Sequence, residues 1–383
     1  MDLVYLDNNA TTRPAPEVVE AMLPFFTELY GNPSSVHRFG QRARQALDEA
    51  RGRVARLIGC GEGEVAFTGG GTESVNTAIR GLLAARSPRK RIVISSVEHS
   101  ATRELCHQLA KQGAELVEIG VDSQGTLGLD ALRAAVTEDV AVVSIMWANN
   151  ETGVIFPVPE IAAICKAQRV PVHCDGTQAI GKVPVNVAEA GVDAMSFAAH
   201  KFHGPKGVGG LFVRRGLRMQ PLLIGGPQER NRRGGTENVP GAVGTGVAAQ
   251  LAMDHLGDMA RVAALRDRLE SGILQRIDDT HVNGRRDRRV PNTTNVGFAR
   301  LEAEAILLLL SEQGVCASAG AACSSGSLEP SPILKAMHLD PRIAHGAVRF
   351  SLSRYTTDRE IDLALEVLPA VISRLRAVLP VGV

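Results

Sequence analysis

The sequence A-A-H-K-F-H-G-P-K-G-V-G-G runs from Ala198 to Gly210. Two short apolar segments, 194–197 and 209–213, lie on either side of its lysine and favour a local antiparallel pair of strands. A lysine that directly follows a buried strand, with His200 beside it and glycines behind, suits a Schiff base with an aldehyde cofactor. Lys201 is therefore the candidate for the covalent anchor of such a cofactor.

Two polar residues in the upstream segment H-C-D-G-T-Q (173–178) fit the same chemistry. Asp175 ends an apolar, strand-like segment, where a buried carboxylate is costly unless a cation such as a protonated pyridine nitrogen pairs with it. Gln178 follows three residues later. The cofactor that needs an amine, an anion beside its ring nitrogen and donors for a phosphate is pyridoxal phosphate. Two simpler interpretations remain open, in which Asp175 caps the following turn and Lys201 is a surface ammonium.

The segment G-G-G-T-E-S (69–74) is a candidate cradle for the phosphate. It follows a strand-like run and opens a helix-like one, so the backbone N–H groups at Gly71 and the hydroxyl of Thr72 could hold an anion. A plain glycine turn with a helix cap would use the same residues. A second glycine-rich segment, 176–182, matches a nucleotide-binding loop but continues with Val183 where such a loop needs Ser or Thr, and we interpret it as a chance match.

Histidines at two strand ends complete this candidate site. We expect His200 to contact the phosphate, because a Gly-Pro pair directly after His203 argues against a helical metal-binding face. No metal site is predicted. His99 follows the strand-like segment 91–98, and strand ends in open α/β sheets face the ligand crevice. A buried structural imidazole is the alternative for His99.

Strand-like and helix-like segments alternate over the first two-thirds of the chain. The strand-like segments are 64–67, 91–95, 115–119, 140–147 and 170–174. This alternation predicts an α/β fold, with a large, doubly wound, mostly parallel sheet covered by helices on both faces.

The last third of the chain has a different pattern. A long helical stretch, 241–277, precedes a polar connector, 281–291, in which the arginines are interpreted as a solvated loop. Strand-like, helix-like and strand-like segments then follow at 295–298, 302–310 and 347–352, which predicts a smaller α+β domain. We expect residues 15–260 to form the large domain, and residues 1–14 with 261–383 to form the small one.

The composition excludes several classes of protein. The chain has 383 residues, a net charge of +1 and 44% hydrophobic residues, so no global field favours nucleic acid or a membrane surface. The N-terminus lacks a basic flank and an apolar core, and the apolar runs are too short to span a bilayer, which predicts a cytoplasmic protein.

Cys323 is the cysteine most suited to chemistry. The six cysteines form no C-x-x-C pair, which indicates reduced thiols. Cys323 lies in a loop rich in Gly, Ser and Ala, within about 316–330, and loops of this kind often carry function. We expect this loop to be mobile and Cys323 to act as a thiolate.

Taken together, these segments resemble the cysteine desulfurases of the NifS/IscS type, within the class V branch of the fold-type-I pyridoxal-phosphate enzymes. The resemblance covers essentially the whole chain. The matching motifs are Y-L-D-N-N-A-T-T from Tyr5, G-N-P-S-S from Gly31, G-T-E-S from Gly71, E-H from Glu98, N-N-E-T-G from Asn149, H-K-F-H-G-P-K-G from His200, R-R-G-G-T-E-N from Arg232, C-S-S-G-S-L-E-P-S from Cys323 and R-F-S-L-S-R-Y-T-T from Arg349.

The resemblance implies a role for each matching position. Lys201 would form the imine and move the proton at Cα, Asp175 would pair with the pyridine nitrogen, and Gln178 would bind the phenolic oxygen. His99 would stack on the ring. The other implied roles are phosphate binding by Thr72, His200 and, from the partner subunit of a homodimer, Thr236; binding of the substrate carboxylate by Asn150 and Arg349; and attack on the substrate sulfur by Cys323.

The implied activity is conversion of L-cysteine to L-alanine, with the sulfur left on Cys323 for iron–sulfur cluster assembly, including nitrogenase maturation. The sulfur would pass to an iron–sulfur scaffold or another acceptor protein. Selenocysteine lyase and class V aminotransferase are the enzymatic alternatives, and a sulfur-carrier scaffold is the non-enzymatic one. Many members of the family carry Ser where this chain has Ala198, which would leave the phosphate with one hydrogen bond fewer.

Overall fold

The computed structural model describes residues 3–320 and 329–378. Its main element is a seven-stranded sheet with the strand order β2-β8-β7-β6-β5-β3-β4. The pairs from β4 to β7 are parallel, and β8 runs antiparallel to both of its neighbours. The strands are β2 (Val65–Thr68), β3 (Arg91–Ser95), β4 (Glu115–Ile119), β5 (Val140–Ser144), β6 (Val172–Asp175), β7 (Ala194–Ala198) and β8 (Gly209–Val213).

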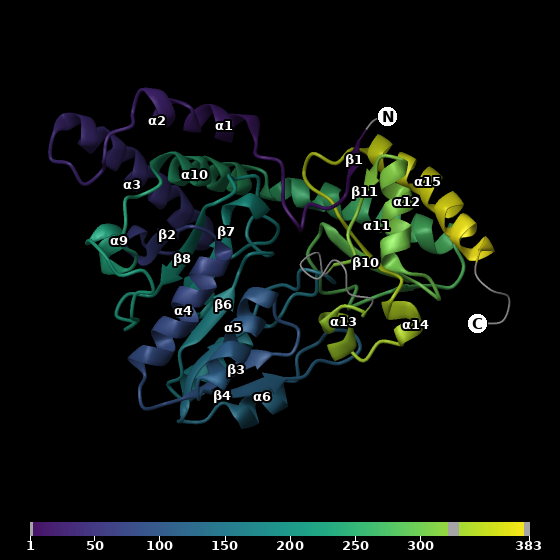
Figure 1. The fold of residues 1–383 in the computed structure, drawn as a ribbon, viewed down its shortest axis with the longest axis horizontal. Coiled ribbons are helices and arrows are strands. Elements are labelled where there is room, and N and C mark those ends of the chain that lie inside the picture. Colours follow the sequence, from purple (N-terminus) through teal and green to yellow (C-terminus); the bar gives the residue numbers. More distant parts are fainter. Residues whose placement is uncertain (1–2, 321–328, 379–383) are drawn as a thin grey trace.

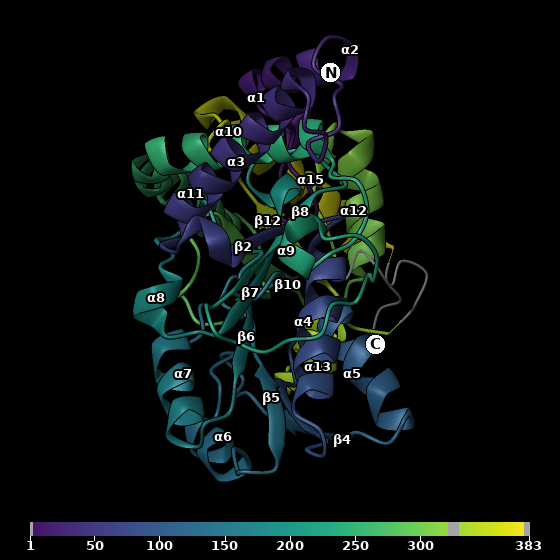
Figure 2. The same cartoon turned by 90° about the vertical axis from the view of Figure 1, so that its left-hand side faces the viewer.

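The expected α/β class and the expected antiparallel pair around the lysine loop are both confirmed. Strands β5 to β8 are buried along their whole length, as continuous apolar runs in a covered sheet require. Helices α4 (Gly71–Ala85) and α5 (Ser100–Lys111) cover one face, and α6 (Leu129–Ala135), α7 (Val158–Ala167) and α8 (Val187–Ala190) cover the other (Figure 2). The sheet is therefore doubly wound.

A further group of helices lies beside the β2 and β8 side of this sheet (Figure 1). Helices α3 and α10 approach each other closely, because a Cβ atom on Gly246 would lie only 2.6 Å from the Cα atom of Ala50. Only a glycine permits that contact. The helices of this group are α1 (Pro16–Met22), α2 (Pro24–Thr27), α3 (Arg38–Ile58), α9 (Gln228–Asn231) and α10 (Val239–Asp254).

A second apolar core is formed mainly by the C-terminal third of the chain, together with Val4 and Leu6 (Figure 1). An antiparallel sheet of order β12-β10-β9 and the parallel pair β1-β11 contribute to this unit. Its elements are β1 (Val4–Tyr5), α11 (Met259–Arg276), β9 (Thr280–Val282), β10 (Thr293–Phe298), α12 (Ala303–Glu312), β11 (Val315–Cys316), β12 (Ala347–Ser351) and α15 (Asp358–Ala377).

The first apolar core lies mainly around the large sheet. The helices α13 (Pro332–Ala336) and α14 (Pro341–Ala344) belong to the C-terminal part of the chain, but they contribute Ile333, Leu334 and Ala344 to this first core. The first core thus reaches across to this segment. The division of the chain into residues 15–260 and the remainder stays a prediction.

Two local expectations for the C-terminal part differ from the structure. The helical stretch 241–277 is two helices, α10 and α11, separated by a short 3-10 turn at Leu256–Asp258. The interpretation of the arginine cluster as a solvated loop is wrong for Arg289. Its side chain is 4% exposed and forms an ion pair of 2.5 Å with Glu270, whose side chain is fully buried. A buried carboxylate requires such a partner.

Candidate active site

One cavity of about 570 Å³ opens at the carboxyl end of the parallel strands. This is where open α/β sheets bind ligands. Its lining includes nine positions that the sequence singled out: Gly71, Thr72, His99, Asn150, Asp175, Gln178, His200, Lys201 and Arg349. Residues of the large-sheet part and Arg349 of the C-terminal part therefore line one cavity, which we call the cofactor pocket.

Lys201 enters the pocket from a short 3-10 turn, Ala199–Lys201, that directly follows β7. Its Nζ atom donates hydrogen bonds to the backbone oxygens of Asn9, at 2.6 Å, and Ala10, at 2.8 Å. The surface-ammonium alternative is therefore not what the structure shows. The N-terminal segment holds the amine at the edge of the pocket.

Asp175 is the last residue of β6 and is 8% exposed. Its Oδ1 atom accepts a hydrogen bond of 3.0 Å from the backbone N–H of Thr177. The turn-capping alternative is thus realised, and it uses one of the two carboxylate oxygens. Gln178, in the turn after β6, donates from Nε2 to the backbone oxygen of Asn9 at 3.0 Å, and its Oε1 accepts from Lys182.

The N-terminus of α4 forms another side of the pocket. The first N–H groups of a helix have no partner inside the helix, and Gly71 and Thr72 supply two of them here. A Cβ atom on Gly71 would lie 3.3 Å from the Cβ atom of Ala198 and 3.7 Å from the hydroxyl of Thr177. Thr177 also lines the pocket, so it brings a hydroxyl to the place where Ala198 lacks one.

Both histidines of the pocket are neutral at neutral pH. Burial lowers the pKa of His99, and its Nδ1 atom caps α5 by accepting a hydrogen bond of 3.1 Å from the N–H of Ala101. The neutral ring therefore carries its proton on Nε2. Burial, with the charge of Lys201 next, lowers the pKa of His200 to about 4, and its Nδ1 atom lies 3.1 Å from the hydroxyl of Thr11.

Arg349 lies in β12 and is 2% exposed. Its Nη2 atom forms an ion pair of 2.7 Å with Asp7, and its Nη1 atom donates to the backbone oxygens of Asn150, at 2.9 Å, and Gly320, at 3.3 Å. The Nε atom of Arg349 and the Oδ1 atom of Asn150 are buried without a hydrogen-bond partner among the described residues. Two polar atoms at this end of the pocket are thus left for a ligand.

Two buried carboxyl groups line the pocket and were not assigned a role from the sequence. Burial raises the pKa of Glu98 to about 8, although Glu98 accepts hydrogen bonds from Ser95 and from the N–H of Met146. Burial raises the pKa of Glu151 to about 7, and Glu151 accepts a hydrogen bond of 2.6 Å from Ser331. The motifs E-H and N-N-E-T-G contain these residues, but only the fold reveals that they are buried.

The cysteines that the structure describes are all free thiols. Burial raises the pKa of Cys60, Cys106 and Cys165 to about 12, and it also raises the pKa values of Cys174 and Cys316. A thiol with a raised pKa is a poor nucleophile at neutral pH. Cys323 and most of its predicted loop lie outside the described residues. Gly320 and Pro332, on either side of that segment, line the pocket.

Thr236 does not line the cofactor pocket of its own chain. It borders a separate cavity of about 190 Å³ together with Gly207 and Glu237. Its contribution to the phosphate site of a partner subunit stays a prediction. No cluster of three or more His, Cys, Asp or Glu side chains is placed to hold a metal ion within residues 3–320 and 329–378.

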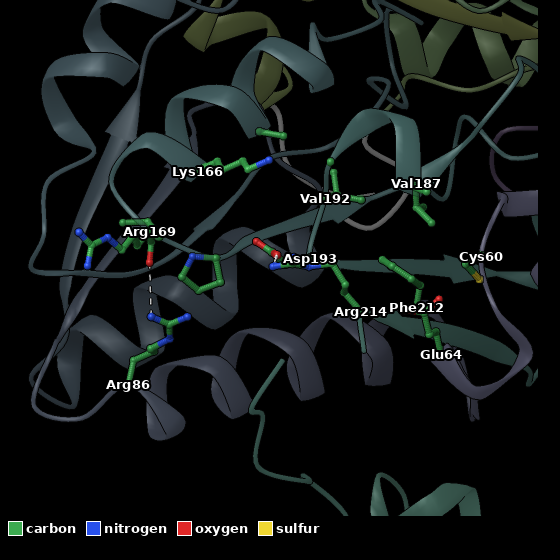
Figure 3. A pocket seen from close by; sticks show the side chains of 15 residues that line it. Cys60, Glu64, Arg86, Lys166, Arg169, Val187, Val192, Asp193, Phe212 and Arg214 are labelled. Carbon is green, nitrogen blue, oxygen red and sulfur yellow. Dashed lines mark hydrogen bonds and ion pairs between the residues drawn. The ribbon is translucent and has the colours of Figure 1, made fainter. Parts of the chain in front are cut away.

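Another cavity, of about 450 Å³, lies at the opposite end of the large sheet, near the first residues of β6 and β7. Figure 3 shows its basic side chains, including Arg86, Lys166 and Arg214. Arg86 donates to the backbone oxygen of Arg169 at 3.4 Å, and the Arg214 side chain, which pairs with Asp193, is 60% exposed. We call this the amino-end cavity.

The groups around the cofactor pocket fit pyridoxal phosphate. They provide an amine at Lys201, a buried carboxylate at Asp175, and unpaired N–H groups at the start of α4. The unpartnered Nε atom of Arg349, a donor, fits the carboxylate of an amino acid, and the unpartnered Oδ1 atom of Asn150, an acceptor, fits an N–H or S–H group of the same ligand.

Comparison with known proteins gives a consistent assignment. The model of the family "Aminotransferase class-V" matches residues 4–364. The chain is 52% identical to cysteine desulfurase 2 of Trichormus variabilis, and the match covers 99% of this chain and 96% of that protein.

Solved structures agree with this result. A NifS-like protein is 39% identical and has a TM-score of 0.91, with 98% of this chain and 100% of that chain covered. SspA, solved in complex with cysteine, is 30% identical and has a TM-score of 0.82, with 92% and 99% covered. The chain therefore belongs to the class-V aminotransferase family, and within it to the NifS-type cysteine desulfurases.

Proposed function

We propose that this protein is a pyridoxal-phosphate-dependent cysteine desulfurase, which converts L-cysteine to L-alanine and leaves the sulfur on Cys323. The observation that carries the proposal is the cofactor pocket, where the amine of Lys201, the carboxylate of Asp175 and the guanidinium of Arg349 meet. A carrier scaffold without catalysis needs none of these buried charges.

Seven residues of one subunit would hold the cofactor in this proposal. Lys201 would bind its aldehyde carbon, Asp175 would pair with its ring nitrogen, and Gln178 would donate to its phenolic oxygen. The start of α4 (Gly71 and Thr72) would hold the phosphate together with His200. His99 lies against the ring. When bound, pyridoxal phosphate supplies the electron sink that makes the Cα proton of an amino acid acidic.

Arg349 and Asn150 orient the substrate carboxylate. Arg349 already shares its charge with Asp7, which is 2.7 Å away, and its backbone contacts fix the plane of the guanidinium. A guanidinium held in this way is preorganised, so little side-chain entropy is lost when a carboxylate binds. The free Oδ1 atom of Asn150 is available to the substrate ammonium or thiol, and the free Nε atom of Arg349 to its carboxylate.

The remaining residues move protons and sulfur. Lys201 takes the Cα proton and returns it, and His99, neutral with its proton on Nε2, exchanges a proton at the reacting face. The Cys323 thiolate attacks the substrate sulfur, and an S–S bond forms as the substrate Cβ–Sγ bond breaks. The electron pair of the broken bond stays on the carbon skeleton, which takes up a proton to become alanine, and Cys323 is left as the persulfide. Support for Cys323 comes from the five described cysteines, whose raised pKa values leave them as unreactive thiols.

We also propose a homodimer in which Thr236 of each subunit reaches the phosphate of the other, and a sulfur acceptor from iron–sulfur cluster assembly. The protein is expected in the cytoplasm. Within the described part of the chain, no helix is long and apolar enough to cross a membrane.

The test is alanine release from L-cysteine by the wild-type protein and by a Cys323→Ser variant. We expect stoichiometric alanine and sulfide from the wild type in the presence of a thiol reductant, and almost no alanine from the variant. Mass spectrometry after brief exposure to cysteine should find one added sulfur on the peptide that contains Cys323. Alanine formation by the variant at the wild-type rate would refute the role of Cys323, and no alanine from either protein would refute the activity. Turnover of selenocysteine alone would indicate a lyase instead.

A further inference from the structure

Lys182 is a buried lysine behind the cofactor pocket. It is 7% exposed and lies in the turn that follows β6, four residues after Gln178. Its Nζ atom donates a hydrogen bond of 3.0 Å to Oδ1 of Asn9 and another to Oε1 of Gln178. Lys182 and Lys201 both border a small cavity of about 30 Å³, whereas Lys182 is absent from the described lining of the cofactor pocket.

Asn9 connects this lysine to the rest of the site. Its Oδ1 atom also accepts from Asn292 at 3.1 Å, and its backbone oxygen accepts from both Gln178 and Lys201. Its Nδ2 atom donates to Thr293 at 2.9 Å. Asn9 is 1% exposed, so none of these bonds competes with bulk water. The amides of Asn9 and Gln178 and the two lysines therefore form one buried network.

The electrostatic setting of Lys182 is unfavourable for an ammonium. Burial, with the charges of Lys201 and Arg349 next, lowers the pKa of Lys182 well below its usual value. His200 and His203, which also face it, have pKa values lowered to about 4 and bring no negative charge. Both described acceptors of Lys182 are neutral amide oxygens. A lysine amine retains N–H donors in either protonation state, so these hydrogen bonds do not depend on its charge.

The orientation of the Gln178 amide follows from these donors. An amide has one oxygen that accepts and one nitrogen that donates. Here the oxygen accepts from Lys182, while the nitrogen donates to the backbone oxygen of Asn9, which can only accept. With Oε1 turned toward Lys182, Nε2 is turned away from it. One of the two N–H groups of Nε2 binds the backbone oxygen of Asn9. The second N–H remains for a ligand in the cofactor pocket, which Gln178 lines.

We propose that Lys182 is a positioning residue that locks the Gln178 amide with its N–H groups toward the cofactor, so that Gln178 acts as a donor to the phenolic oxygen. The inference rests on the proposed function only in taking pyridoxal phosphate as the ligand. Lys182 is the last residue of the segment 176–182, which we interpreted above as a chance match to a nucleotide-binding loop. The proposal gives this residue a structural role in the cofactor site. Without Lys182, only the hydrogen bond from Nε2 to the backbone oxygen of Asn9 would oppose a flip of the amide that presents its oxygen instead.

The experiment uses the holoenzyme without substrate and records the visible absorption band of the bound cofactor against pH. Lys182→Met removes the donor and keeps much of the side-chain volume. We expect the pH midpoint of the band to move by about half a unit or more, because a hydrogen bond to an ionisable group shifts its titration. The dissociation constant of the cofactor should rise about two- to tenfold, the size of one lost hydrogen bond.

A double-mutant cycle separates the proposed role from a simple change of charge. In a Gln178→Ala background, Lys182→Met should cause little further movement of the midpoint, because the amide through which it acts is gone. The matched control is Asn292→Ala, which removes another donor to Oδ1 of Asn9 but has no hydrogen bond to Gln178. We expect Asn292→Ala to leave the midpoint unchanged.

Three results would overturn the proposal: an unchanged midpoint in Lys182→Met, an equal movement in the Gln178→Ala background, or an equal movement in Asn292→Ala. If Lys182→Met fails to fold, Lys182→Gln, which keeps a shorter donor, should show a smaller movement in the same cycle. The readout does not need turnover. A wild type that binds cofactor but forms no alanine would refute the proposed function and leave this test intact.

Discussion

The two ends of the large sheet both carry cavities lined by charged side chains, but these side chains differ in how deeply they are buried. At the carboxyl end, Arg349 is 2% exposed, Asp175 is 8% exposed and Glu98 is fully buried. At the amino end, Asp193 is also buried, but its ion-pair partner Arg214 has a side chain that is 60% exposed. The volumes, about 570 and 450 Å³, are similar.

The difference shows that burial of charge, more than cavity size, marks the functional end. Exposed charges are solvated, and their pairing contributes little free energy. Buried charges are costly. Burial is the largest cause of the shifted pKa values of Glu98, His99 and Lys182, and neighbouring charges such as Asp175 and Lys201 contribute less. Substitutions of the buried charges should therefore matter at the carboxyl end, and substitutions of the exposed basic side chains at the amino end should matter hardly at all.

The largest effect is expected from Lys201→Ala. Loss of a group that transfers protons in the transition state typically lowers a rate by about 10²–10⁴-fold, and the covalent anchor is lost as well. Alanine formation from L-cysteine, measured with the cofactor in excess, should fall by at least the lower value. A variant that retained more than a tenth of the wild-type rate would break the assignment of this lysine.

Arg349→Ala should raise the KM for L-cysteine more than tenfold while the spectrum of the bound cofactor stays intact. A charge-assisted hydrogen bond contributes on the order of 2 kcal/mol, and a paired fork more. Asp7→Asn is the matched control, because it removes the ion-pair partner and keeps the guanidinium. Steady-state kinetics would contradict this role if KM stayed within twofold of the wild type in Arg349→Ala.

A moderate effect on stability is expected from Glu98→Gln. The folded-state pKa of Glu98 is raised from 4.5 to about 8, so its contribution to stability is fully present below about pH 4.5 and is lost as pH rises toward 8. Glutamine cannot ionise. The difference in the free energy of unfolding, variant minus wild type, should increase between pH 5 and pH 8 by about 1 kcal/mol or more.

Denaturant unfolding at several pH values measures this difference. The pH dependence should flatten in the variant over that window. A difference that is constant from pH 5 to pH 8, or that falls, would show that Glu98 is ionised in the folded protein.

The smallest effect is expected from Lys166→Ala at the amino-end cavity. Lys166 is exposed, and substitutions at such positions usually change stability by less than about 0.5 kcal/mol. Alanine formation and the cofactor spectrum should both stay within experimental error of the wild type. A loss of activity comparable with that of Arg349→Ala would contradict the claim that the exposed charges of the amino-end cavity have little effect on function.

Much of this architecture could be predicted from the sequence, because its signals are local. Strands β3, β4 and β8 begin and end at the predicted residues, since each is a short run rich in apolar residues between polar turns. The residues at strand ends, such as Asp175 and His99, could be assigned to one edge of the sheet for the same reason.

What the sequence could not reveal depends on contacts between distant segments. Asn9 and Lys182 are 173 positions apart, and neither has a pattern that predicts their hydrogen bond. Arg289 lies in a run of arginines typical of a solvated loop, yet its side chain is buried and forms an ion pair with the buried Glu270 on α11. The burial that raises the pKa values of Glu98 and Glu151 likewise comes from the tertiary structure.

The central claim, that the carboxyl-end pocket holds the cofactor on Lys201, is tested most directly by borohydride reduction of the holoenzyme and peptide mapping. Reduction makes the bond between lysine and cofactor permanent, so mass spectrometry can identify the residue. We predict the modification on the peptide that contains Lys201, in nearly every chain that had bound cofactor. Modification of Lys182 or of Lys166 in the amino-end cavity, with Lys201 unmodified, would contradict the account.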